Sequence, residues 1–265
     1  MFCRVVTTWS TRLICVLMIG SAHADETDKI ATDRPDFVES SNVVGRSFVQ
    51  IETSVARERK KTNGLRERTF STPSLLRIGV SDSTELRLET DGYSVMHANS
   101  GVTSARERGF ADTSFGVKWH VLDPIDALPS FAFLAHLDVP TGSIAFRGDG
   151  VRPSLRMVAE WELPDDYSLG VMPGISSGRN DRGQRFTSAI FGIVLGKEWT
   201  EQLRTFVEFA APQLAAKRFG GNEASFDIGA AYLISKHWQV DTALSAGLTK
   251  RTPNLSWTIG LSTKF

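Results

Sequence analysis

The last strand-like segment of the 265-residue chain alternates strictly between two kinds of side chain. Apolar or lipid-tolerant residues occupy every second position, and the chain ends on an aromatic residue: Trp257, Ile259, Leu261, Thr263 and Phe265. Successive side chains of a β-strand point to opposite faces, so one face of this segment suits lipid and the other suits water. The pattern is typical of the closing strand of a transmembrane β-barrel. An amphipathic strand of a soluble sandwich would alternate in the same way.

The N-terminal 24 residues favour the barrel over the sandwich. Two arginines precede a short apolar run over residues 13–19, and a small-x-small site follows at Ala22–Ala24. This arrangement predicts a secretory signal peptide over residues 1–24. The apolar run is far shorter than the ~20 residues that a membrane helix needs, so we do not expect an N-terminal anchor.

Composition excludes several classes of protein. Both cysteines, Cys3 and Cys15, lie in the predicted signal peptide, so the mature chain would have no disulfide and no cysteine-ligated metal. The full chain has 30 basic and 30 acidic residues, and loss of the two signal-peptide arginines leaves a near-neutral protein with no argument for a nucleic acid partner. A mean hydropathy of −0.13 argues against a helical membrane protein. A barrel is compatible with it, because only alternate residues need be apolar.

The connections between alternating segments are alternately short and long, as in barrels with short periplasmic turns and longer outer loops. This predicts an all-β, transmembrane, antiparallel up-and-down barrel of about twelve strands with both chain ends periplasmic. The predicted division is a signal peptide at 1–24, a leader or periplasmic plug at 25–45 and a barrel at 46–265. Outer loops are expected near 57–68, 94–107 and 141–151.

Most of the large aromatic residues stand beside the short turns. Aromatic side chains with a polar edge favour the membrane boundary, so they predict a periplasmic girdle; the alternative is that they simply pack in a core. They are Trp119, Trp161, Tyr167, Trp199, Trp238 and Phe265.

Charged residues of both signs occupy the face opposite the apolar one. In a sandwich this face would be solvated, whereas in a barrel it lines the lumen, where opposed charges either cross-link and block it or form a constriction. The predicted lumen residues are Glu52, Arg77, Arg87, Glu89, Asp112, Lys118, His120, His136, Asp138, Arg156, Glu160, Arg204, Glu208, Asp227 and Asp241.

The histidines do not form a convincing catalytic or metal site. The run His97–Gly101 loosely resembles the His-x-Ser-Asn-Gly run of outer-membrane phospholipase with its order swapped, but we expect it to form a turn in an outer loop. His120 and His136 could in principle bind a metal beside Asp112 and Asp138, and we expect them to join a polar lumen network instead. No catalytic residue, metal or cofactor is predicted.

Three segments carry a resemblance to a known family: Thr32–Ser40, Gly109–Lys118 and Asp138–Gly142. With them, the chain resembles the outer-membrane transporters named after the meta-cleavage pathway of phenol degradation. The resemblance implies a barrel in the outer membrane of a Gram-negative bacterium that transports small solutes, with hydrophobic or aromatic compounds as candidates. Outer-membrane lipid, lipopolysaccharide and the barrel-assembly machinery are the expected partners. That machinery is expected to recognise the terminal strand through Trp257, Ile259, Leu261 and Phe265.

The segment before the first strand is polar, and Pro35 excludes it from a central strand position. It could fold into the periplasmic mouth and pair its charges with those of the lumen, or it could be a solvated leader. The predicted plug residues are Asp33, Arg34, Pro35, Asp36 and Phe37, with Glu39 as a further charge. The alternatives to transport are a plugged structural barrel and, third, a lipid-modifying enzyme.

Overall fold

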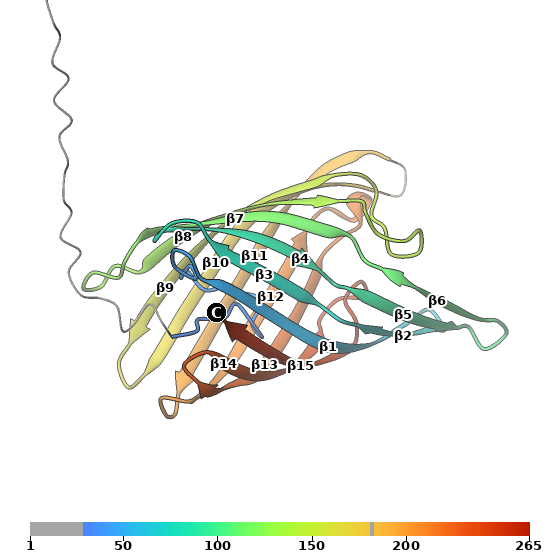
Figure 1. Ribbon diagram of the computed structural model, residues 1–265. Coiled ribbons are helices and arrows are strands. Elements are labelled where there is room, and N and C mark those ends of the chain that lie inside the picture. The colour runs from blue at the N-terminus through green and yellow to red at the C-terminus, as the bar shows by residue number, and fades with distance from the viewer. Residues whose placement is uncertain (1–28, 181–182) are drawn as a thin grey trace, which may run out of the picture.

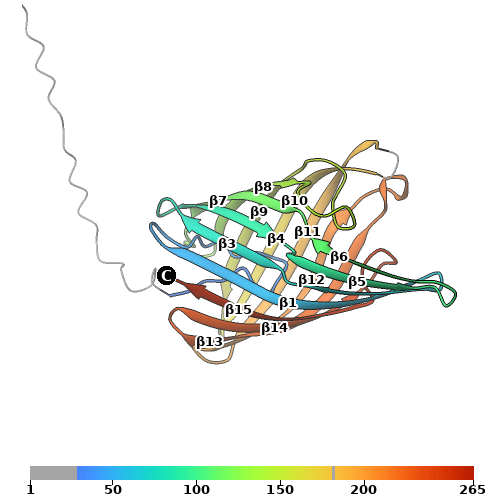
Figure 2. The same cartoon turned by 45° about the vertical axis from the view of Figure 1, so that its right-hand side comes forward.

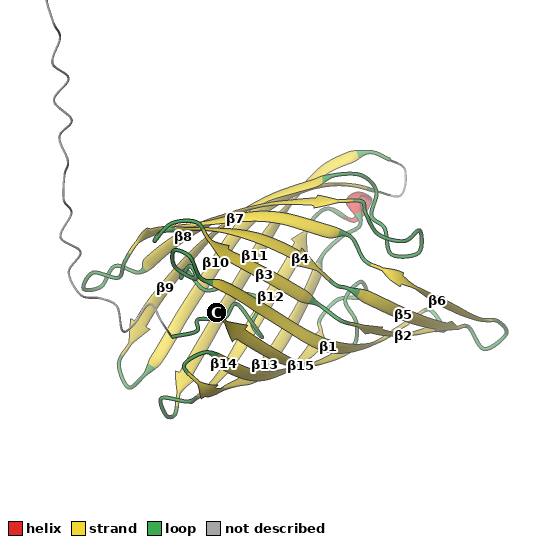
Figure 3. Cartoon of the chain, viewed as in Figure 1, coloured by secondary structure: helices red, strands yellow, loops and turns green. Residues whose placement is uncertain are grey.

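The computed structural model describes residues 29–180 and 183–265, and strands make up nearly all of the wall (Figures 1 and 3). The predicted signal peptide lies outside the described residues. No helix in the described ranges has the length and apolar character needed to cross a membrane. The strands are β1 (Val49–Thr62), β2 (Leu65–Ser71), β3 (Ser74–Gly79), β4 (Thr84–Thr90), β5 (Tyr93–Asn99), β6 (Ser104–Phe110), β7 (Thr113–Leu122), β8 (Ser130–Val139), β9 (Arg152–Leu163), β10 (Tyr167–Arg179), β11 (Arg185–Glu198), β12 (Leu203–Leu214), β13 (Glu223–Ser235), β14 (Trp238–Gly247) and β15 (Leu255–Lys264), with a 3-10 helix η1 at Lys217–Phe219.

All strand pairs are antiparallel, and β15 pairs with β1 from Gln50 opposite Lys264 to Arg59 opposite Leu255, which closes the sheet. Three strands are interrupted, so that β2 with β3, β4 with β5 and β6 with β7 are each two halves of one strand. Pro73 stands in the first interruption, since it has no N–H for a ladder. The fifteen segments therefore form twelve barrel strands, and the predicted fold and strand number are confirmed.

Two predicted outer loops are wrong. The region 57–68 continues β1 to Thr62 and turns at Asn63-Gly64 into β2, and the region 94–107 is mostly β5 and β6. These strands carry charge on their faces, so they lack the apolar alternation that marks a lipid-facing strand. They project beyond the barrel on the side away from the short turns (Figures 1 and 2). Residues 141–151, by contrast, lie outside any strand, as predicted.

The outward face is apolar and exposed, as the alternation predicts. On β4 and β7, for example, Leu88 is 39% exposed and Val117 is 40% exposed, while Lys118 between the apolar positions of β7 is 0% exposed. Of the predicted girdle, Trp161 is half-buried and the other five are exposed: Trp119, Tyr167, Trp199, Trp238 and Phe265. Large apolar side chains that remain exposed on a closed barrel match a lipid-facing band.

The buried apolar cluster lies inside the barrel. The N-terminal segment 29–48 precedes β1 and runs within the lumen rather than along the outside (Figure 1). Val38 and Phe37 of this segment pack against side chains of the wall, which are Leu134, Val158, Met172, Val194, Phe206 and Ala243. The lumen is therefore filled at this level.

Candidate functional site: the lumen segment and the cavity beside it

Residues 29–48, here called the lumen segment, cross the barrel interior close to the short turns. At one end the Ile30 N–H donates to the carbonyl of Lys236 in the β13–β14 turn, at 2.8 Å. At the other end Gly45 lies against the backbone of Gly79, where a Cβ on Gly79 would lie only 1.6 Å from the Gly45 carbonyl oxygen. Only glycine allows so close an approach of two backbones. The segment is thus fixed at both ends of its path.

Asp33 is the electrostatic centre of the segment. Its carboxylate accepts hydrogen bonds from Lys118 Nζ at 2.7 Å and from Arg87 Nη1 at 2.5 Å, and Arg77 Nη1 lies 3.3 Å away. Burial alone raises the pKa of the Asp33 carboxyl, but the three cations outweigh burial and hold its pKa well below the usual range. One carboxylate of the segment therefore neutralises part of the charge of three buried cations of the wall.

A wider ion-pair network surrounds this centre. Arg77 Nη1 lies 3.0 Å from Glu52, and Arg77 Nε lies 2.8 Å from Glu85. Glu39 of the lumen segment binds Arg87 at 2.7 Å and Arg156 at 2.8 Å. Breaking one partner of a buried pair leaves an uncompensated charge, which costs about 3–5 kcal/mol. The network thus couples the position of the segment to the wall.

The other side of the segment faces β12 and β14. Asp36 Oδ2 accepts a hydrogen bond from Arg204 of β12 at 2.5 Å. Arg34 Nη2 donates to Asp241 of β14 at 3.2 Å. Charges of the segment therefore meet opposite charges on both sides of the barrel. The peptide bond between Arg34 and Pro35 is cis.

The backbone of the segment is bound by side chains of the wall instead of by a neighbouring strand. Several backbone N–H groups donate to wall carboxylates, while Arg77 and Lys118 donate to backbone carbonyls of the segment. Glu52 accepts from Asp33 at 3.1 Å and from Arg34 at 3.2 Å, and Glu208 accepts from Phe37 at 2.8 Å and from Val38 at 2.7 Å. Two further bonds run from Ser41 to Glu160 at 2.5 Å and from Val44 to Glu85 at 2.8 Å.

Glycines of the wall make room for the apolar part of the segment. A Cβ on Gly192 would lie 2.6 Å from Val38 Cγ2 and 3.0 Å from Phe37 Cδ1. A Cβ on Gly170 would lie 3.1 Å from Val38 Cγ1. A side chain at Gly192 therefore requires Val38 to shift and Phe37 to give way slightly.

The structure places the predicted lumen residues on the inward face, and it shows that the lumen segment covers several of them. Of the two arrangements considered for opposed lumen charges, Arg87 and Lys118 take part in cross-linking, because the lumen segment covers them and they are 4% and 0% exposed. Arg156 keeps partial exposure beside Glu39. The sequence analysis missed Glu85 and Gln50, although the side-chain period also places both on the inward face.

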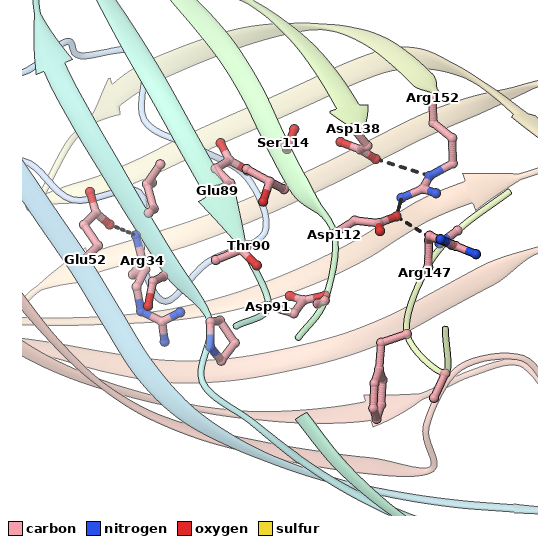
Figure 4. Close-up of a pocket in the computed structure, with 18 residues that line it drawn as sticks. Arg34, Glu52, Glu89, Thr90, Asp91, Asp112, Ser114, Asp138, Arg147 and Arg152 are labelled. Carbon is pink, nitrogen blue, oxygen red and sulfur yellow. Dashed lines mark hydrogen bonds and ion pairs between the residues drawn. The ribbon is translucent and has the colours of Figure 1, made fainter. Parts of the chain in front are cut away.

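A cavity of about 590 Å³ lies between the lumen segment and the β8–β9 loop (Figure 4). Asp112 links its lining residues: Oδ2 accepts from Arg152 at 3.0 Å and from the Gly148 N–H at 2.9 Å, and Oδ1 accepts from the Gly142 N–H at 3.0 Å. Arg152 also lies 3.4 Å from Asp138. The cavity is lined by charges of both signs with a few apolar groups: Arg34, Glu52, Pro73, Ser74, Leu75, Glu89, Thr90, Asp91, Ala111, Asp112, Thr113, Ser114, Asp138, Ala145, Phe146, Arg147, Gly148 and Arg152.

Three groups could in principle hold a metal ion, since Glu39, Glu89 and His136 each offer a ligand atom within 4.8 Å of the others. However, the Arg87 guanidinium lies 2.7 Å from Glu39 and 2.9 Å from Glu89. The guanidinium supplies the positive charge that a metal would bring. His120 lies elsewhere, with Nδ1 3.0 Å from the Ser41 carbonyl and Nε2 2.9 Å from Asp123.

The run His97–Gly101 does not assemble a hydrolytic site. His97 is exposed on β5, and the Asn99 side chain accepts the Gly101 N–H at 2.7 Å across the turn between β5 and β6. The hydroxyl of Ser100 pairs with Thr103 in the same turn, at 2.9 Å. Asn99 and Ser100 thus stabilise a hairpin.

A closed barrel with an apolar outer band and a filled, charged lumen defines an outer-membrane β-barrel protein. A family model described as the MetA-pathway of phenol degradation matches residues 32–265, nearly the whole described chain. The chain belongs to this family. No curated protein matches its sequence.

Solved structures with the same fold include an outer membrane channel from Pseudomonas putida F1, with a TM-score of 0.60, 11% identity and coverage of 87% of this chain and 99% of the channel. The β domain of the Bordetella autotransporter BrkA has a TM-score of 0.56 and 12% identity, over 83% of this chain and 99% of that domain. The translocator domain of NalP from Neisseria meningitidis has a TM-score of 0.53 and 12% identity, over 82% of this chain and 87% of that domain. At these identities the likeness concerns the fold.

Proposed function

We propose that this protein is a solute channel in the outer membrane of a Gram-negative bacterium, closed by the lumen segment and opened when that segment moves. The observation that supports the proposal is how the segment is held. Side chains of the wall hold it, through ion pairs, hydrogen bonds with its backbone such as those to Glu208, and the packing of Val38, and it is not a strand of the sheet. The segment can therefore leave while every strand pair of the wall stays intact.

The proposed substrates are small solutes, with aromatic compounds first among them. The family description supports this choice, because phenol degradation starts from small aromatic molecules. The cavity supports it as well, since about 590 Å³ falls within the range of about 300–1,000 Å³ that small-molecule sites occupy. Phe146 and Leu75 supply apolar contacts among the charged groups, which suits a ring bearing a polar substituent.

The test is single-channel conductance of the purified protein in planar bilayers. We expect low conductance from the full mature chain and several-fold higher conductance after deletion of residues 29–45. The substitution Asp33→Asn should raise conductance in the same direction, because it removes the anion between Arg77, Arg87 and Lys118. The matched control is Asp126→Asn, which changes the same chemistry in an exposed turn.

Uptake into liposomes separates transport of solutes from passage of ions. Vesicles that carry the deleted form should take up phenol-like solutes faster than vesicles that carry the full chain. If the deleted form inserts and folds yet conducts nothing, the channel proposal is wrong, and the alternative of a plugged structural barrel remains.

A further inference from the structure

Eight basic side chains gather on the outward face of the strands that project beyond the barrel. We call this set the basic panel. It comprises Arg57, Arg59 and Lys61 of β1, Arg66 and Arg68 of β2, His97 of β5, and Arg106 and Arg108 of β6, and all eight are exposed.

The strand register places the central members side by side. Arg59 is opposite Arg68, Arg68 is opposite His97, and His97 is opposite Arg106. Directly opposed residues of antiparallel strands have Cβ atoms about 4.5–5.5 Å apart, and like charges in such pairs repel. Arg59 and Arg68 form such a like-charged pair, and Arg106 stands in the same row, so this row of the sheet favours an anion bound over it.

Acidic residues are kept off this face. Glu58, Glu67 and Glu107 alternate with the arginines and point to the opposite side of the same sheet. Among the ion pairs of the described residues, none includes a member of the basic panel. The protein thus supplies cations here without supplying their counter-ions.

Protection of a sheet edge explains only part of this pattern. Among the described strands β6 pairs with β5 alone, and charges on such an edge oppose aggregation. That reason applies to Arg106 and Arg108 but not to β1 and β2, which are paired on both sides. The inner strands of the panel need a different explanation.

The basic panel begins where the apolar band ends. Exposed aromatic side chains lie on the same outward face at its lower border: Phe70 and Trp257 stand opposite Arg57, and Tyr93 pairs with Phe110 just below Arg108. From Val80 at the short-turn end to Phe70 the strand advances ten positions, or about 33 Å, which at a tilt of about 40° spans about 25 Å of membrane height. This equals the apolar band of such barrels. Arg68 and its row therefore lie at the level of the outer headgroups.

We propose that the basic panel binds the phosphorylated sugar headgroup of lipopolysaccharide in the outer leaflet. This proposal rests on the proposed location in a Gram-negative outer membrane and is independent of whether the barrel conducts. Guanidinium groups bind phosphate oxygens in pairs of parallel hydrogen bonds. Several phosphates carried on one sugar scaffold can meet several rows of the panel at once, which a lipid with a single phosphate cannot do.

The experiment measures binding of purified diphosphoryl lipid A to the folded protein in a neutral detergent. The test variant is R59Q/R68Q/R106Q, which removes three charges from the central row. The control is K217Q/R218Q/K250Q, which removes three charges from other exposed positions outside the panel. Heat-modifiability on gels verifies that each variant is folded. If the test variant does not fold, R106Q/R108Q on the edge strand replaces it.

We expect the test variant to bind diphosphoryl lipid A about tenfold or more weakly, because charge-assisted bonds are lost, while the control stays within about twofold of the unmodified protein. Monophosphoryl lipid A and phosphatidylglycerol should both bind the unmodified protein more weakly than diphosphoryl lipid A. Equal affinity of the test variant and the unmodified protein would overturn the proposal. Equal affinity for phosphatidylglycerol would also overturn it, because the panel would then attract any anionic lipid.

Discussion

Closure of the lumen depends most on Asp33, because its carboxylate contacts Arg77, Arg87 and Lys118 at once. Asp33→Asn should therefore destabilise the docked segment by about 3–5 kcal/mol, the cost of leaving buried charge without its partner. Ser41 is 1% exposed, so a cysteine placed there reports release through its rate of labelling by a small maleimide. We expect labelling to be slow in the Ser41→Cys background and much faster when Asp33→Asn is added.

Asp126→Asn in the same background serves as the control, because Asp126 lies in an exposed turn. Equal labelling rates in all three proteins would mean that the Asp33 contacts do not hold the segment.

A single apolar substitution on the inner wall should have the same effect without touching any charge. Gly192→Val directs a side chain into the space occupied by Val38 and Phe37, where even a Cβ would lie 2.6 Å from Val38. The lipid-facing side of β11 is unchanged, so we expect a folded, heat-modifiable barrel with a displaced segment and raised conductance. Gly178→Val is the matched control, because a Cβ there would meet Phe186 at an ordinary 3.5 Å. Unchanged conductance of Gly192→Val would contradict this account of how the segment packs.

At this scale the sequence predicted which side chains point inward but not which of them meet. The side-chain period places Arg77, Arg87 and Lys118 on the inward face, and the structure agrees. Their burial against Asp33 depends on the path of a segment that has no periodicity of its own. The bonds from backbone N–H groups to Glu52 and Glu208 leave no signal in the sequence at all.

Among the elements, β7 offers a test of which face meets lipid. Val117→Arg should destabilise the folded barrel by about 2–4 kcal/mol if Val117 lies near the middle of the bilayer, whereas Val121→Arg near the short turns should cost about 0–1 kcal/mol. Both residues are exposed on the outward face, at 40% and 44%, so they differ mainly in depth. Denaturant unfolding in lipid vesicles gives the two free energies of unfolding. If the two substitutions lower the free energy of unfolding equally, the bilayer lies at a different height on the barrel from the one assumed here.

The projecting hairpins show why part of the fold escaped prediction. Apolar alternation identifies strands only where one face meets lipid, and it predicted β3, β4 and β7 well. Beyond the lipid both faces meet water, so β2 and β6 carry mainly charged and polar residues, β5 lacks strict apolar alternation, and all three resemble loops. The alternation of arginine and glutamate in β2 and β6 is itself a strand period, and a search for alternating charge sign would have found these two strands.

For the whole molecule, we expect the lumen segment to keep the barrel closed at high salt concentration. At 1 M salt the Debye length is about 3 Å, so salt strongly screens the interaction between two charges in solvent. It screens the interaction within a buried ion pair much less. Arg77, Lys118 and Glu52 are 0% exposed, so the conductance of the full chain should rise from 0.1 to 1 M KCl only in proportion to the conductivity of the solution. A disproportionate step in conductance would show that water and ions already reach these pairs.

The closed antiparallel barrel and its strand number followed from the sequence because lipid imposes a period on every strand that crosses it. The state of the lumen did not follow, because charged residues on an inward face are equally compatible with a wet pore and with a docked segment. Contacts between Asp33 and β4 or β7 span more than fifty residues of sequence and decide between the two.

Because the lumen segment is not a strand of the sheet, and several of its N–H groups between Asp33 and Val44 donate to wall carboxylates and not to a neighbouring strand, its departure exposes no unpaired sheet edge. Removal of a barrel strand would create an adhesive edge, whereas removal of this segment leaves side chains that water can hydrate. Repeated exit and return should therefore carry little risk of aggregation. The same feature makes the segment intolerant of proline at Phe37, Val38 or Val44, where the bonded N–H would be lost.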